Sequence, residues 1–105
     1  MHIIISDREP VGHESITVSN TAIGVTASLK SPTTGFFKTQ QCQEIFITLE
    51  TNPIRYTVDG TTPTDAIGHL VSAGQSITIR NKTAIQNFLM IRTGSDATAM
   101  VTTFF

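Results

Sequence analysis

The side chains best able to do chemistry in this chain are a single cysteine and three histidines. Cys42 has no histidine near it in the sequence, so we expect a small apolar residue rather than a nucleophile, although folding could still bring a histidine close. His2, His13 and His69 lie in separate segments, and no two have the close spacing of a zinc-binding pair. One cysteine cannot complete a structural zinc site. These residues therefore predict neither covalent catalysis nor a metal centre.

Oxygen ligands gather around one predicted turn, where Asp59, Thr61 and Asp65 are close in sequence. Such residues could bind Ca²⁺, but the segment lacks the alternating acids and the terminal glutamate of a full calcium loop. The simpler interpretation is that Asp59 closes the turn. The chain also contains no glycine-rich phosphate loop and no nucleophile elbow. We therefore expect no catalytic residue, no metal and no cofactor, and the chain is predicted not to be an enzyme.

Composition limits the remaining classes. A chain of 105 residues is long enough for one domain, expected over residues 1–105. Only 14% of the residues are charged and the net charge is -1, which argues against nucleic-acid binding because that needs a basic face. The apolar run at residues 3–5 is too short for a secretion signal, and no stretch approaches the roughly 20 apolar residues that cross a membrane. A lone cysteine excludes an intrachain disulfide, which fits synthesis in a reducing cytoplasm.

Short runs of β-branched residues alternating with polar ones are typical of β-strands. They predict an all-β fold, a single antiparallel β-sandwich of about seven short strands, with at most one helical turn at residues 84–87. Residues 7–13, which include Pro10 and Gly12, are expected to form a loop. The expected strands cover residues 2–5, 15–19, 23–29, 43–50, 54–58, 76–80, 88–92 and 97–104.

Two pairs of these strands are separated by short connections. Residues 43–50 and 54–58 are joined by Thr51-Asn52-Pro53, which is too short for a crossover, so we expect an antiparallel hairpin. Residues 88–92 and 97–104 are joined by Thr93-Gly94-Ser95-Asp96 and are expected to form a second hairpin.

The most informative segment is the strand at residues 54–58 and the turn that follows it. Alternation along this strand places Tyr56 on the inner face. Asp59 and Gly60 then supply a turn, and we expect a positive φ at Gly60. Pro63 cannot donate to a β-ladder, so strand pairing should stop before it.

This segment resembles a known signature. Residues 56–64 match the pattern YTxDGTxPT of small immunoglobulin-like β-sandwich domains, best known as accessory domains beside chitobiase-type glycosidases. Residues 85–102 match IxNFxxIRTGxDATxxVT, and this combination is similar to small structural proteins of tailed bacteriophages. The resemblance covers roughly the second half of the chain. It implies a fold and a virion context, and it brings no catalytic residue.

Four aromatic residues lie outside the regular pattern. Residues 30–41 are polar and aperiodic, yet they contain the adjacent pair Phe36 and Phe37. One of these rings could cap the open end of the sandwich, or the pair could anchor a partner, because aromatic side chains are enriched at interfaces. Phe104 and Phe105 pose the same question, because neighbouring strand residues point to opposite faces and both rings cannot enter one core. We expect all four to contribute to a partner-binding surface.

The resemblance and the aromatic residues together predict a non-catalytic virion structural protein, made in the host cytoplasm. A capsid decoration or cement protein is expected, with the major capsid protein or other virion proteins as partners and with homo-oligomers in the particle. The alternatives are a head–tail or tail accessory component, or a carbohydrate-binding or adhesion module. Sugar binding usually needs exposed flat aromatic residues, but this chain has no tryptophan, and its one tyrosine, Tyr56, is predicted to face inward.

Overall fold

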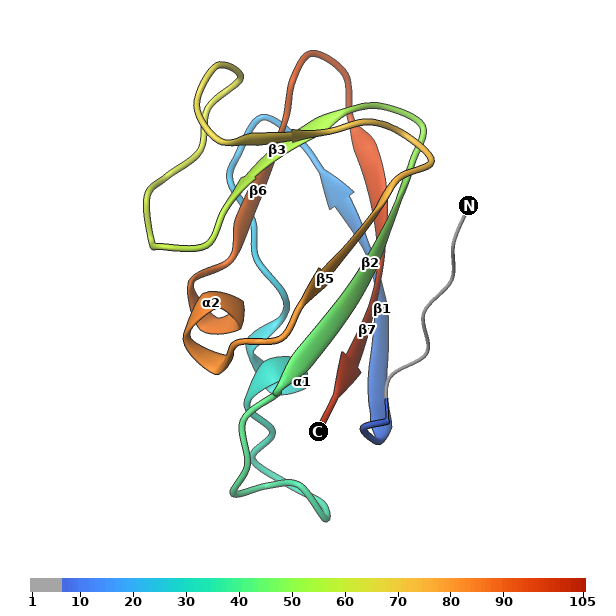
Figure 1. The fold of residues 1–105 in the computed structure, drawn as a ribbon, viewed down its shortest axis with the longest axis vertical. Helices are drawn as coiled ribbons and strands as arrows, with labels where there is room; N and C mark the ends of the chain where they lie inside the picture. The colour runs from blue at the N-terminus through green and yellow to red at the C-terminus, as the bar shows by residue number, and fades with distance from the viewer. Residues whose placement is uncertain (1–6) are drawn as a thin grey trace.

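Two antiparallel sheets packed face to face make up most of this computed structural model, which describes residues 7–105 (Figure 1). One sheet has four strands in the order β1-β7-β2-β5 and the other has three in the order β4-β3-β6. The predicted all-β antiparallel sandwich is therefore confirmed. In chain order the elements are β1 (Pro10–Val18), α1 (Ala27–Lys30), β2 (Glu44–Glu50), β3 (Ile54–Thr57), β4 (His69–Val71), β5 (Ser76–Ile79), α2 (Lys82–Asn87), β6 (Leu89–Arg92) and β7 (Ala97–Phe104).

Alternating burial explains why these segments are strands. Along β2, Ile45, Ile47 and Leu49 are buried, whereas Phe46 and Thr48 on the opposite face are only half-buried. The central strand β7 turns small side chains inward, including two alanines, and so leaves room for larger residues from the other sheet. Buried residues from both sheets and from α2 form one hydrophobic core cluster. Burial of this apolar area is the main driving force for folding.

Both predicted hairpins are wrong, because each connection carries the chain from one sheet to the other. β2 pairs with β5 and β7, and β3 pairs with β4 and β6. Thr51 has a φ of 73°, an uncommon conformation for a β-branched residue, at the point where the chain leaves β2. The Asn52 side-chain amide donates to the Asp96 carbonyl at 2.9 Å. The two sheet-crossing connections are therefore joined to each other.

Several element boundaries also differ from the predictions. Residues 10–13 belong to β1 rather than to a loop, and β4 was not predicted. Residues 23–29 do not form a strand: Ile23 makes an isolated bridge to Met90, and a helix begins at Ala27. The predicted helical turn is found within α2, where Asn81 caps the helix by accepting from the Ala84 N–H at 2.9 Å. The strand predicted at residues 2–5 lies outside the described residues.

The position of the last strand distinguishes this sandwich from a constant-type immunoglobulin domain. Such a domain also divides its strands four and three, but its final strand lies in the smaller sheet. Here β7 lies in the larger sheet, between β1 and β2. As a result the end of β7, α1 and the loop that follows α1 all lie at one end of the molecule (Figure 1).

Candidate interaction surface

The aperiodic segment predicted as a partner contact forms a closed loop at this end of the sandwich. The Cys42 N–H donates to the Lys30 carbonyl at 2.8 Å. The two ends of residues 31–41, here called the aromatic loop, are therefore held close together. The Gln86 side chain of α2 donates to the Ser31 hydroxyl at 3.2 Å, and the Lys30 ammonium donates to the Gln86 carbonyl at 3.2 Å. These bonds fix the base of the loop against α2.

Gly12 of β1 lies where α1 packs against the four-stranded sheet. A Cβ at Gly12 would lie 2.9 Å from the Leu29 Cδ2 and 2.8 Å from the Thr103 Oγ1. A larger residue at this position would require the ends of these two side chains to shift, and glycine lets Leu29 of α1 lie close to β1 without that shift.

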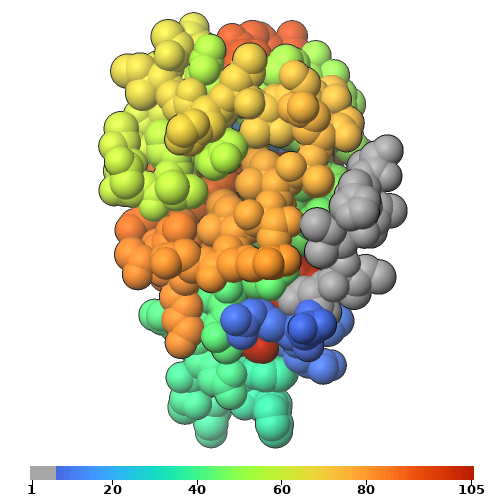
Figure 2. Space-filling view, in the orientation of Figure 1, coloured from blue at the N-terminus to red at the C-terminus, as the bar shows by residue number. Residues whose placement is uncertain are grey.

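The tip of the aromatic loop presents an exposed ring. Gly35 has a φ of 82°, and its carbonyl accepts from the Lys38 N–H at 3.3 Å, which makes a tight turn. Phe36 lies within this turn and is 87% exposed. In the space-filling view, the loop projects as the lower end of the molecule (Figure 2). The ring on this projecting tip is therefore accessible to another molecule.

The Phe36 ring is linked to the core through contacts with two other phenylalanine rings. Its ring packs edge-to-face on Phe37, with centroids 4.9 Å apart and planes at 75°. Phe37 is partly buried and in turn packs on Phe105 at 5.2 Å. Phe105 belongs to the core cluster. Phe37 therefore caps the end of the sandwich, which is one of the two interpretations left open by the sequence, whereas partner binding by the exposed Phe36 stays a prediction.

Phe104 and Phe105 are not exposed, contrary to the expectation from the sequence. They are only 8% and 7% accessible. Phe105 has left the strand and enters the core, where its N–H donates to the Glu9 carbonyl at 3.0 Å. Phe104 lies on the outer face, opposite both Pro10 and Glu44 in the strand register, so directly paired neighbours flank its ring. Their predicted partner binding stays a prediction, and in the described chain only Phe36 is an accessible ring of the four.

The aromatic loop is nearly uncharged. Between Ser31 and Gln43 the sequence contains one ionisable cation, Lys38, and no acid. The remaining exposed residues are threonine, glycine and glutamine. In its exposed aromatic ring and its low charge this surface resembles interface cores, although lysine is depleted there. Its chemistry is suited to contact with another protein surface.

The turn residues take the roles that the sequence predicts. Gly60 has a φ of 89°, which confirms the expected positive value. The Asp59 carboxylate accepts from the Thr61 N–H at 3.1 Å, and this bond, followed by one from the Thr61 side chain, lowers the pKa of Asp59. Pro63 follows β3 and is buried. Asp59 therefore closes the turn.

The other chemically capable residues are dispersed or buried. Cys42 is fully buried, and burial raises the pKa of its thiol, which keeps it protonated at neutral pH. His13 contacts Thr102, and His69 packs beside Tyr56 at 5.3 Å between ring centroids. His2 lies outside the described residues. Within residues 7–105, no three His, Cys, Asp or Glu side chains gather where they could hold a metal ion.

Comparison with protein-family models, with curated proteins and with solved structures finds no match to this chain. Neither helix in residues 7–105 has the length and apolarity to span a membrane.

Proposed function

We propose that this chain is a non-catalytic structural protein of a tailed-phage virion that decorates the assembled head. The similarity of residues 56–64 and 85–102 to small phage structural proteins supports the virion context. The observation that carries the binding role is Phe36, an 87% exposed ring at the tip of a closed, nearly uncharged loop. The proposed partner is the major capsid protein.

The proposed mechanism is mechanical rather than chemical. Phe36 enters an apolar depression on the shell, and its support by Phe37 limits the conformational freedom that binding would otherwise remove. A single buried aromatic anchor gives a modest affinity. Many copies on one particle bind both the shell and each other, and their weak contacts together give strong attachment through multivalency. Rigidity of the sandwich and repetition on the particle would then reinforce the shell.

Co-sedimentation with assembled phage heads that lack this chain tests the proposal. Wild-type protein should pellet with the heads and saturate at a fixed ratio. Phe36→Ala should weaken attachment by at least about thirtyfold, because truncating an interface anchor costs about 2 kcal/mol or more. Leu70→Ala is the matched control, since Leu70 is also exposed, at 56%, but lies on β4. It should bind heads like the wild type.

The outcomes separate the alternatives. Equal binding of wild type and Phe36→Ala would remove the aromatic loop as the contact. Binding to tails or to head–tail connectors, with none to heads, would favour the accessory-component alternative. Failure to bind any virion part, with binding to immobilised oligosaccharides, would favour the carbohydrate-binding alternative.

A further inference from the structure

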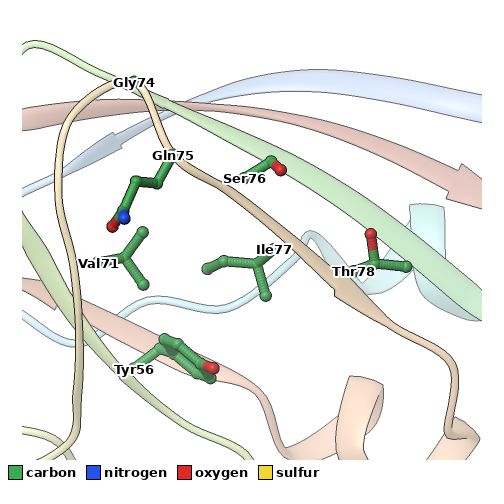
Figure 3. A pocket seen from close by; sticks show the side chains of 7 residues that line it. All are labelled: Tyr56, Val71, Gly74, Gln75, Ser76, Ile77 and Thr78. Atoms are coloured by element: carbon green, nitrogen blue, oxygen red, sulfur yellow. The ribbon is translucent and has the colours of Figure 1, made fainter. Parts of the chain in front are cut away.

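A hollow lies between the two sheets on the side where both end in short edge strands. It is open to solvent, has a volume of about 710 Å³, and is lined by Tyr56, Val71 and the segment 74–78. Val71 belongs to β4, the edge of one sheet, and Ile77 belongs to β5, the edge of the other. In the close view these apolar side chains and the Tyr56 ring point into the same space, whereas Ser76 and Thr78 point to the other side of β5 (Figure 3).

Among residues 7–105, the backbone of β5 has hydrogen-bonding groups without a strand partner beside this hollow. Within residues 7–105, β5 pairs with β2 alone. The Leu49 N–H of β2 donates to the Gln75 carbonyl at 3.1 Å, so the backbone of Gln75 faces β2. Because backbone groups alternate in direction along a strand, Ser76 and Thr78 present their N–H and C=O groups to the free side. Both residues are exposed.

The sequence of β5 does nothing to block pairing at this edge. Edge strands are usually protected by proline, by lysine or other charges, or by a bulge. Residues Ser76–Ile79 contain neither proline nor a charge, and their register with β2 is regular. The residues that line the hollow are also uncharged. This edge therefore suits an uncharged β-strand, whose alternate side chains would cover the hollow.

We propose that the occupant is β5 of a second copy of this chain, paired antiparallel about a two-fold axis. In this register Ser76 of each copy lies opposite Thr78 of the other, which joins the free backbone groups in hydrogen-bonded pairs. Ile77 lies opposite Ile77 of the second copy on the inner face, where the two side chains cover the mouth of each hollow. The four-stranded sheets would form one continuous sheet across the dimer.

Charge and side-chain type favour a second copy as the occupant. Arg80, which is exposed, would lie opposite Gly74 of the other copy, so no like charges meet across the axis. On the outer face the hydroxyls of Ser76 and Thr78 form a polar cross-strand pair, and on the inner face isoleucine meets isoleucine. The contact involves few residues, so its buried area would be smaller than that of a standard stable interface. We therefore expect a weak dimer. This inference does not depend on binding to heads.

Analytical ultracentrifugation of the free chain tests the proposal. The wild type should dimerise reversibly as its concentration rises from about 10 µM to about 1 mM, as expected of a small interface. The variant with both Ser76→Lys and Thr78→Lys should weaken dimerisation at least about tenfold, because like charges then lie directly opposite. The variant with both Ser76→Glu and Thr78→Lys should recover it, because opposite charges then face each other in the proposed register.

Two controls complete the experiment. Ser15→Lys with Thr17→Lys places the same charges on β1, the other edge of this sheet, where both residues are exposed, and should leave the dimer unchanged. Tyr56 is the only tyrosine and tryptophan is absent, so tyrosine fluorescence reports on the hollow directly. Its quenching by acrylamide should fall as the dimer forms. Thermal melts should show that every variant folds, and Ser76→Glu with Thr78→Glu carries the same repulsion if the lysine pair does not fold.

Any of three results would overturn the proposal: a wild-type monomer throughout the concentration range, a dimer unaffected by like charges on β5, or a dimer lost through the β1 control. Dimerisation that is lost with the lysine pair but not regained with the opposite charges would reject the two-fold register. Loss of head binding by Phe36→Ala with an intact dimer would show that the two surfaces are separate.

Discussion

The rings of Phe37 and Phe105 lie with their centroids 5.2 Å apart and their planes at 42°, and this contact joins the aromatic loop to the core. Phe36 in turn packs edge-to-face on Phe37. The three rings form a row that runs from the buried interior to a fully exposed tip. Stability should therefore depend on the inner rings, and partner binding should depend on the outer one.

The first prediction separates these two roles. Phe37→Ala should lower the free energy of unfolding by about 1–2 kcal/mol, less than the 3–5 kcal/mol typical of a fully buried phenylalanine, because Phe37 is only partly buried. Phe36→Ala should change it by less than about 0.5 kcal/mol, as for other exposed sites. Urea unfolding of both variants measures the difference. Equal destabilisation by the two substitutions would mean that the row of rings is not organised as described.

The second prediction concerns the turn after β3. Gly60→Ala should destabilise the protein by about 1 kcal/mol, because an L-residue is strained at the observed φ of 89°. No atom lies within 4 Å of a Cβ built at Gly60, so the cost comes from the backbone alone.

A matched control for the turn is Gly94→Ala. Its Cβ also meets nothing within 4 Å, but its φ is not positive. This substitution should be neutral, or stabilising by about 0.4–1 kcal/mol through the unfolded chain. A melting temperature for Gly60→Ala equal to that of Gly94→Ala would show that the turn is not strained.

The third prediction is a pH dependence at Asp59. The Thr61 N–H stabilises the ionised carboxylate, so the pKa of Asp59 is lower in the folded than in the unfolded state. This stabilisation is fully present above the unfolded pKa of about 3.9 and is lost as the pH falls through the lower, folded pKa. Asp59→Asn should therefore be less stable than the wild type at neutral pH, and the difference should shrink in acid.

Melting temperatures from pH 7 down to about pH 2 test the linkage. Thr61→Ala keeps the backbone N–H and should retain most of the pH-dependent difference. If the difference in melting temperature between the wild type and Asp59→Asn stays constant across this range, the assigned role of the carboxylate is contradicted.

Local features of the fold could be predicted well from the sequence. Alternation along residues 43–50 places Ile45, Ile47 and Leu49 on one face of a strand, and in the structure all three enter the core. The Asp59-Gly60 pair gave the turn and the sign of φ, because the chemistry of that turn depends on adjacent residues alone. The aperiodic segment at residues 30–41 was correctly separated from the strands, although Lys30 is the last residue of α1.

The pairing of strands could not be predicted in the same way. Alternation says which face of a strand is buried but does not identify the neighbouring strand. The short connection after β2 suggested a hairpin, but Thr51 adopts a left-handed conformation where the chain turns into the other sheet. Burial of Phe104 likewise depends on strands β1 and β2 on either side of it, which are distant in the sequence.

Cryo-electron microscopy of phage heads reconstituted with this chain is the sharpest test of head binding through Phe36. We expect density for the sandwich on the outer surface of the shell, with the aromatic loop toward the capsid and Phe36 buried in it. Reconstitution with Phe36→Ala should lose most of that density. Heads that carry no additional density, or a bound sandwich whose aromatic loop points into solvent, would rule out head binding through Phe36.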